Sequence, residues 1–557
     1  MAAGAKHPDW CIINKDGNPV NSPEWLGSSD AGDRMCPRSP YVDELMIPQL
    51  LELIDKYDID GFWIDGDVWA METCYCDRCR QAFKEKTGIG EPPTDALDPN
   101  WSVWWNFTRE SFEEYVTHYC EAIHRYKPGV LVASNWYQGF RCPGKPKVPT
   151  DWISGDALVE WKEDPRIDAR FISTRGKPWD LMLWSIYGTL HDTTTMKPVQ
   201  MLQQQAATII ALGGNIQTCE NPFLGIRSGQ LVPWRMRHLG KLAEFVKNRQ
   251  ELCQNTKTIP QIAVLHSEHH FRSTQKNNNL FFTVDMAAAR GAAANLIECQ
   301  YGVDILDEWA LLPCIADFPV VVAPEQDCMS EEMVHALMNY VNGGGKLLVS
   351  GANALNRFGG EFLGVSEGEL IDNTIYHVPA QDESVPIRSS QWRLVKVTTA
   401  QSLATIGETP LLAEQLLPNP AATLNQVGKG RIAYIPFNVF REFDRIRYPL
   451  ARAFIQGVLQ ALAGPLDVEV KAPGCVDVIL RQKDEKMIIH LINQTDCKSH
   501  EIPMVGPITV KMKLGKKPEK VYLAFEEAEI KWEYADNGIL SVDVPQLLIH
   551  SAVVVEQ

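Results

Sequence analysis

Residues 60–79, "DGFWIDGDVWAMETCYCDRC", combine a strand-like run, two carboxylates and three cysteines. Asp65 and Asp67 stand at the end of "GFWID", and side chains two apart in a strand point to one side. A carboxylate between Trp63 and Trp69 at a strand end suits glycoside hydrolysis. That reaction needs two carboxyl groups across one sugar, one as nucleophile or base and one as acid. Asp65 is therefore a candidate catalytic residue, and a helix-capping or structural role is equally open for it.

The cysteines of this segment indicate a metal site. Cys74, Cys76 and Cys79 form C-x-C-x-x-C, and Cys36 in "DRMCPRSPY" is a candidate fourth ligand. Zinc prefers four soft ligands in a tetrahedron, and four sulfurs leave no open position for substrate. We expect a structural zinc here; three unligated cysteines on a loop are the alternative.

The second carboxyl must come from another segment. Glu160 in "GDALVEWKED" has a valine and a tryptophan beside it, and apolar neighbours raise the pKa of an acid. Glu220 in "NIQTCENPFLG" has a more polar setting that suits a contact with a sugar hydroxyl. Asp156 and Asp180 are weaker candidates. We favour Glu160 as the acid/base.

The elements that must position these residues alternate along residues 1–255. Strand-like runs are "GFWID", "VLVASN", "WISGD", "DLMLWSI" and "NIQTCE", with helical periodicity between them. Such alternation predicts a (β/α) barrel, whose active site lies at the carboxyl ends of its strands. Polar and aromatic residues follow these runs: Asp65, Asn135, Asp156, Trp184 and Glu220. A complete barrel has eight strands; the runs are fewer, so we expect the barrel to lack its first strands.

Two further units are expected. Residues 256–465 alternate strand and helix as in a small doubly wound α/β domain, without the glycine frame of a nucleophile elbow. Residues 466–557 form short alternating strands, with "KDEK" as a turn, which predicts a β-sandwich.

Composition excludes several classes of partner. The net charge of −17 argues against nucleic acid and anionic membranes, and the chain has no apolar run of membrane-spanning length. "NGGGKLLVS" lacks the pattern of a phosphate loop, so we expect no organic cofactor. The 14 cysteines show no disulfide-like spacing and the N-terminus has no apolar signal region, which predicts a cytoplasmic protein.

"MCPRSP" followed by "CYCDRC" and "QAF" resembles the zinc-binding cysteines of family 42 glycoside hydrolases, the β-galactosidases. The resemblance implies a structural zinc on Cys36, Cys74, Cys76 and Cys79. It also implies a domain order of barrel, amidotransferase-like trimerisation domain and small β domain, hence a homotrimer. The chain differs from that family at the acid/base position: the family has Asn-Glu at the end of this strand, whereas this chain reads "IDGD".

"FWIDG" is similar to the nucleophile strand of α-L-fucosidases, which assigns the nucleophile to Asp65. "HPDW", "YDIDGFW", "CYCDRC" and "ENPFLG" together resemble the "hypothetical glycosyl hydrolase 6" group, related to the family 151 α-L-fucosidases. Members of that group have further chain before "HPDW", which agrees with a barrel lacking its first strands.

These observations predict a retaining exo-glycosidase that acts on a carbohydrate in the manner of an α-L-fucosidase. Asp65 would attack the anomeric carbon, and Glu160 would protonate the leaving oxygen and later activate water. The predicted sugar contacts are Trp63, Asp67, Asn135, Trp136, Trp184 and Glu220. The alternatives are a β-galactosidase with Glu220 as nucleophile, and a carbohydrate-binding or assembly protein without activity.

Overall fold

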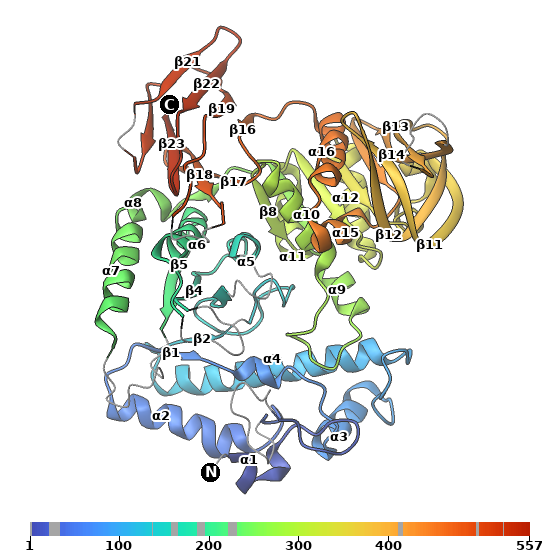
Figure 1. The fold of residues 1–557 in the computed structure, drawn as a ribbon. Coiled ribbons are helices and arrows are strands. Elements are labelled where there is room, and N and C mark those ends of the chain that lie inside the picture. Colours follow the sequence, from blue (N-terminus) through green and yellow to red (C-terminus); the bar gives the residue numbers. More distant parts are fainter. Residues whose placement is uncertain are drawn as a thin grey trace.

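The computed structural model describes residues 3–21, 34–135, 137–157, 165–186, 195–220, 231–409, 416–496, 501–526 and 529–557. Three regions of sheet are visible in Figure 1: short strands in the first half of the chain, a large sheet in the middle, and a β-rich unit at the C-terminus. None of the helices in these ranges is long and apolar enough to cross a bilayer.

The first half of the chain holds parallel strands separated by helices. The strands are β1 (Gly61–Ile64), β2 (Leu131–Ser134), β3 (Asp156–Ala157), β4 (Asp180–Trp184) and β5 (Asn215–Cys219). β1 pairs with β2, β3 with β4 and β4 with β5, all parallel. A parallel bridge between Asn135 and Ser154 joins the two groups. The strands are therefore neighbours in chain order, and their carboxyl ends lie along one edge.

The helices of this half follow the apolar periodicity of the sequence. They are α1 (Ala3–Lys6), α2 (Ile47–Lys56), α3 (Asp77–Thr87), α4 (Trp101–Tyr126), α5 (Pro165–Ile172), α6 (Val199–Ala211), α7 (Pro233–Lys247) and α8 (Gln250–Cys253). α4 runs beside α2 beneath the strands (Figure 1). Its inner face buries Trp105, Phe112 and Tyr119, so it forms a rigid base for β1 and β2.

The middle of the chain forms a nine-stranded sheet in the order β12-β11-β13-β14-β15-β10-β9-β7-β8. Its parallel part is β7 (Ile262–Leu265), β8 (Val303–Leu306), β9 (Val320–Pro324), β10 (Lys346–Ser350) and β15 (Gly430–Ile435). The helices here are α9 (Glu268–Thr274), α10 (Ala287–Glu298), α11 (Glu308–Leu311), α12 (Glu331–Asn342), α13 (Leu355–Phe358), α14 (Gly360–Leu363), α15 (Val439–Ile446) and α16 (Pro449–Ala463). The strands read as continuous apolar runs because both faces are covered.

Antiparallel strands extend this sheet on one side. They are β11 (Val365–Ala380), β12 (Glu383–Val397), β13 (Gln401–Gly407) and β14 (Leu416–Val427). β11 and β12 form a long hairpin with β12 at the sheet edge. The sequence did not predict this hairpin.

The C-terminal unit consists of two antiparallel sheets that share one core. Its strands are β16 (Val468–Lys471), β17 (Val476–Lys483), β18 (Lys486–Asn493), β19 (Ile508–Lys513), β20 (Lys520–Ala524), β21 (Lys531–Tyr534), β22 (Ile539–Val544) and β23 (His550–Glu556). β6 (Lys257–Thr258), from far earlier in the chain, pairs with β17. Val478 and Val553 from one sheet meet Val510 from the other in the core. The predicted turn lies between β17 and β18, where Lys483 faces Lys486.

Buried ion pairs tie the three regions together. Arg175 pairs with Asp307 at 2.8 Å, both side chains being fully buried, and joins the first region to the middle sheet. Arg170 on α5 pairs with Asp477 on β17. A buried charge without its partner is costly, so these pairs fix how the regions meet.

Candidate active site

Asp65 follows β1 directly and is exposed at the carboxyl edge of the strands. Its Oδ1 accepts a hydrogen bond of 3.0 Å from Asn135 Nδ2, on the residue after β2. Oδ2 has no hydrogen-bond partner among the described residues. The carboxylate is thus oriented by one oxygen while the other is open to a ligand, as a nucleophile requires.

Asp156 is the second carboxyl that the strands bring to this point. It is 5% exposed, and its Oδ2 lies 3.5 Å from the same nitrogen of Asn135. Burial first, and then the charge of Asp65, raise the pKa of Asp156 to about 8, although Asn135 and Trp184 favour its ionised form. Asp156 therefore holds a proton at neutral pH.

Asn135 Nδ2 lies 3.0 Å from Asp65 Oδ1 and 3.5 Å from Asp156 Oδ2. These two oxygens are therefore at most 6.5 Å apart. Such a separation agrees with the ~5–5.5 Å of retaining glycosidases better than with the ~6.5–9.5 Å of inverting ones. Two buried atoms here have no partner within the described part of the chain: Oδ1 of Asn135 and Oδ1 of Asp156. Buried polar atoms normally have partners, so unsatisfied ones at a strand edge are expected where a polar ligand binds.

Asp67 leaves the strand direction and becomes part of the wall. Gly66 has a φ of 78°, a left-handed conformation, and Asp67 begins a short 3-10 helix (Asp67–Ala70). Tyr119 and Ser134 donate hydrogen bonds of 2.9 and 2.8 Å to its Oδ2. Burial outweighs these donors and raises the pKa of Asp67 to about 7. The same-side placement expected for Asp65 and Asp67 assumes a strand, and β1 ends before both.

A polar layer lies beneath the strand edge. Trp63 Nε1 donates a 2.8 Å hydrogen bond to Ser154 Oγ, which contacts Asp180 Oδ1 at 2.5 Å. Gln217 on β5 donates to the other oxygen of Asp180 at 2.9 Å. Trp63 and Asp180 are thereby engaged in a network that supports the site from below. The network links β1, β4 and β5 through Ser154, which precedes β3.

Glu220 occupies a separate corner after β5. Arg235 Nη1 lies 2.5 Å from one carboxylate oxygen, and Ser185 Oγ donates to the other. The Arg235 and Glu220 side chains are 5% and 11% exposed. Unlike Asp65, Glu220 has partners on both oxygens. Glu160 and Trp136, two of the predicted site residues, lie outside the described residues.

A cavity of about 230 Å³ opens beside Asp65 and Asp67. Its walls include Tyr41, Trp69 and Tyr115. Aromatic faces combined with carboxylates are suited to a sugar ring, which has both C–H faces and hydroxyl groups.

The four predicted metal ligands meet in the structure. The Sγ atoms of Cys36, Cys74, Cys76 and Cys79 all lie within 4.8 Å of one another. Cys36 Sγ is 3.5 Å from Cys79 Sγ and 3.8 Å from Cys76 Sγ. Tetrahedral zinc with Zn–S bonds of ~2.3 Å separates its sulfurs by about 3.8 Å, so the donor set and spacing fit zinc.

The elements around the cluster explain its assembly. Cys76 is the N-cap of α3, where the helix end favours a thiolate, and Cys79 lies in the first turn of the helix. Hydrogen bonds from the other cysteines, that of Cys36 first, lower the pKa of Cys76. The Cys36 N–H donates to Trp10 O at 2.7 Å, and so brings the fourth ligand to α3. All four cysteines are free, and Cys36, Cys74 and Cys79 are buried.

Comparison with known proteins agrees with this chemistry at the level of class. Residues 3–139 match the family model for Glycosyl hydrolase-like 10, a range that contains Asp65, Asn135 and the four cysteines. None of the curated proteins matches the chain. The match identifies a glycosyl hydrolase-like domain at the N-terminal side, and it assigns no catalytic residue.

Solved structures similar to this chain are glycosidases. Alpha-L-fucosidase isoenzyme 2 from Paenibacillus thiaminolyticus has a TM-score of 0.78 and 20% identity, over 99% of this chain and 85% of that one. A GH42 β-galactosidase from G. stearothermophilus has a TM-score of 0.68 and 16% identity, over 100% and 86% of the two chains. The β-galactosidase from Bacillus circulans sp. alkalophilus has a TM-score of 0.69 and 13% identity, over 100% and 87%. The chain therefore has the multi-domain α/β architecture of these enzymes.

Proposed function

We propose that the protein is a retaining exo-glycoside hydrolase of the α-L-fucosidase type, with Asp65 as the nucleophile. The observation that carries the proposal is the contact of Asn135 Nδ2 with both Asp65 and Asp156. An exposed carboxylate and a buried, protonated carboxyl, both in contact with Asn135, would supply the two groups that the reaction needs. The cavity of about 230 Å³ beside Asp65 has room for a single sugar ring, which supports the proposal of exo action.

Each carboxyl group would act in two steps. Asp65 forms a bond to the anomeric carbon while the glycosidic C–O bond breaks, and the leaving oxygen takes a proton from the acid/base. The deprotonated acid/base then removes a proton from water, whose oxygen displaces Asp65 and releases the sugar. Asn135 holds Asp65 in place and stabilises the ionised form of Asp156 between these steps.

We assign the acid/base role to Asp156, in place of Glu160. Asp156 has the raised pKa that a general acid needs, and Asn135 bounds its distance from Asp65. Glu160 is four residues further along the chain, outside the described residues, and is the rival that a kinetic test must address.

The test compares Asp156→Asn with Glu160→Gln on two aryl glycosides that differ only in leaving group. The acid/base variant should lose activity on the poor leaving group by about 10²–10⁴-fold and keep far more on the activated one, which needs little protonation. We expect this pattern for Asp156→Asn and near wild-type kinetics for Glu160→Gln. The reverse pattern assigns the role to Glu160.

A β-galactosidase with Glu220 as nucleophile is the second candidate function. The similarity to β-galactosidases in fold favours it, and the contacts with Arg235 and Ser185 fix the position of the Glu220 side chain. Aryl fucosides and galactosides distinguish the two: release from the fucoside supports the first proposal, and release from the galactoside supports the second. Release from neither would favour a binding or assembly protein without activity.

The remaining predictions concern the whole chain. We propose that β1 to β5 with their helices belong to a (β/α) barrel, and that residues 256–465 form an amidotransferase-like domain through which the protein trimerises. We also propose that the four-cysteine cluster binds a structural zinc and that the protein is cytoplasmic. A light-scattering mass of one chain at micromolar concentration would contradict the trimer.

A further inference from the structure

The middle sheet has a cavity at the point where its strand order reverses. β7 lies between β8 and β9, so the chain passes from β7 to one side and then to the other. In open parallel sheets, ligands bind at the carboxyl ends of the strands at such a switch point. A cavity of about 200 Å³ lies there, bordered by α9 after β7, by the turn after β9 and by the starts of α10 and α15.

Glu325, the first residue after β9, has a strained backbone conformation, and hydrogen bonds hold its side chain at the cavity. Its φ is 54°, a left-handed conformation that a non-glycine residue adopts at a cost. Its carboxylate accepts the N–H of Phe440 at 2.7 Å and that of Arg441 at 3.3 Å, at the start of α15. The residue is 5% exposed, and burial raises its pKa to about 8. Glu325 is therefore neutral at physiological pH.

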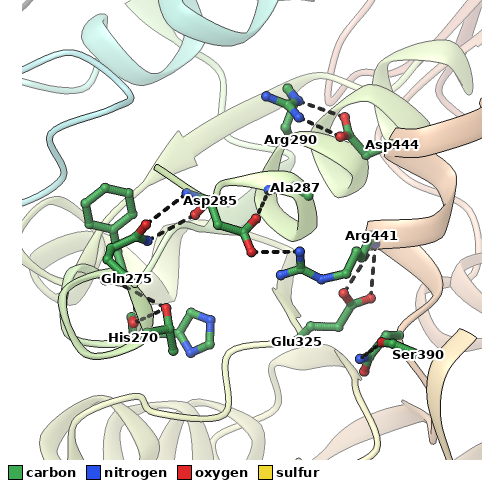
Figure 2. Close-up of polar contacts among 12 residues, drawn as sticks. His270, Gln275, Asp285, Ala287, Arg290, Glu325, Ser390, Arg441 and Asp444 are labelled. Carbon is green, nitrogen blue, oxygen red and sulfur yellow. Dashed lines mark hydrogen bonds and ion pairs between the residues drawn. The ribbon is translucent and has the colours of Figure 1, made fainter. Parts of the chain in front are cut away.

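Arg441 and Asp285 supply balanced charges (Figure 2). Arg441 Nη1 lies 2.7 Å from Asp285 Oδ2, and the other oxygen of Asp285 accepts the Ala287 N–H at 3.1 Å. Burial opposes ionisation of Asp285, but Arg441 outweighs it and lowers the pKa of this carboxyl. The pair is ionised and nearly neutral in sum, so it adds no net charge to the cavity.

Two lining groups have unused hydrogen-bonding capacity. His270 Nδ1 accepts the Cys328 N–H at 3.2 Å, which places the ring proton on Nε2, and burial lowers the pKa of His270 to about 4. Its Nε2–H has no partner among the described residues. Asp327 Oδ2 is bonded to Asn353, while its buried Oδ1 has no partner in the described part of the chain. A donor and an acceptor are thus available on the cavity wall.

The cavity is rigidly framed. Arg290 on α10 forms two hydrogen bonds with Asp444 on α15, of 2.8 and 2.6 Å (Figure 2). Gly291 allows the helices to approach closely, because a Cβ there would lie 2.0 Å from Phe440 O. The starts of both helices are therefore fixed around the cavity before any ligand arrives, which lowers the entropic cost of binding.

We infer that this cavity is a binding site for a neutral monosaccharide. Each sugar hydroxyl both donates and accepts, which matches His270 Nε2–H, Asp327 Oδ1 and the remaining N–H groups of Arg441. Phe271 and the alanines at the start of α10 offer apolar surface to the C–H groups of a ring. The carboxylates disfavour an anion and Arg441 disfavours a cation. The site is separate from the proposed active site, and the inference rests on the proposed function only for the choice of sugars.

Hydrogen exchange measured by mass spectrometry on the full chain tests this site. L-fucose and D-galactose are titrated separately, with glycine and inorganic phosphate as charged controls. We expect saturable protection of peptides covering 268–274 and 439–446 with a sugar and not with glycine or phosphate. Peptides covering 61–67 and 131–135 report the candidate active site in the same experiment, so failure of one site is distinguishable from failure of the other.

Variants assign the protection to the cavity. Asp327→Asn should raise the half-saturating sugar concentration at 268–274 about tenfold, because the amide has one acceptor oxygen where the carboxyl group has two. Asp317→Asn, the same change at an exposed position outside the cavity, should leave it unchanged. Ala287→Leu fills the cavity without removing a polar partner and should abolish the protection. No protection with either sugar, protection by glycine or phosphate instead, or wild-type behaviour of both cavity variants would overturn the inference.

Discussion

Asp65 and Asp156 are held around a single nitrogen, Nδ2 of Asn135, at 3.0 and 3.5 Å. One carboxyl is exposed and the other is buried, and this difference in environment is the basis of the roles that we propose for them. A solvent-accessible carboxylate is suited to attack. A desolvated carboxyl keeps its proton and is suited to donate it.

Neutralising the nucleophile should abolish turnover and spare the fold. Asp65→Asn keeps the size of the side chain and is at an exposed position, so the melting temperature should change little. Turnover of an aryl α-L-fucoside should fall by a factor on the order of 10³ or more. Glu220→Gln is the matched comparison, and a larger loss there than in Asp65→Asn would contradict the assignment.

Asp156 should make the protein less stable as pH rises. Its pKa is about 8 in the folded protein, against a usual value of 3.8. Between about pH 4 and pH 8, Asp156 therefore holds a proton in the folded state and has lost it in the unfolded state. Ionisation of the unfolded state lowers the free energy of unfolding progressively as pH rises through this range. Asp156→Asn removes the effect, so its melting temperature should exceed that of the wild type by a margin that grows from pH 5 to pH 8. A constant margin would show that Asp156 is ionised in the fold.

Removing Asn135 should shift the pH dependence of activity. Asn135 favours the ionised form of Asp156, so Asn135→Ala should raise the pKa of Asp156 further. Activity of the wild type should decline above about pH 8, where Asp156 loses its proton. In Asn135→Ala this decline should move to higher pH, besides a lower maximal rate. A merely structural role would lower the rate without moving the decline.

The cysteine cluster should bind about one zinc per chain. Cys76→Ser should lose the metal and lower the melting temperature, because binding energy at such a site is folding energy. Cys314→Ser is the control, since Cys314 is also half-buried and lies outside the cluster. Metal analysis of protein purified without chelator measures the outcome. Absence of metal from the wild type would contradict the prediction.

Local patterns predicted the elements well where periodicity was clear. The strand at Gly61–Ile64 and most of the helix at Trp101–Tyr126, from Phe107 onward, follow from their apolar spacing. The hairpin from Val365 to Val397 was missed because its strands carry mixed polar residues and prolines, and gain their stability from pairing with each other. Pairing partners distant in sequence are not visible in a local pattern.

Only part of the candidate site was predicted, because contacts between segments distant in sequence are likewise not visible in a local pattern. A strand-end position was sufficient to select Asp65 and Asn135. Asp156 ranked as a weak candidate because its burial and its contact with Asn135 depend on three strands meeting. The partner of Glu220, Arg235, was not foreseen, since it lies on α7, 15 residues further along the chain.

Trapping of the glycosyl-enzyme intermediate tests the central claim most directly. The protein is incubated with deoxyfluoro-fucosyl fluoride, which forms the intermediate readily and releases it slowly, and is then digested and analysed by mass spectrometry. The account predicts one deoxyfluorofucosyl group per active chain, attached to Asp65 in the peptide that contains "FWIDG". A label on Glu220, or hydrolysis of an aryl fucoside with inversion and no label, would contradict it.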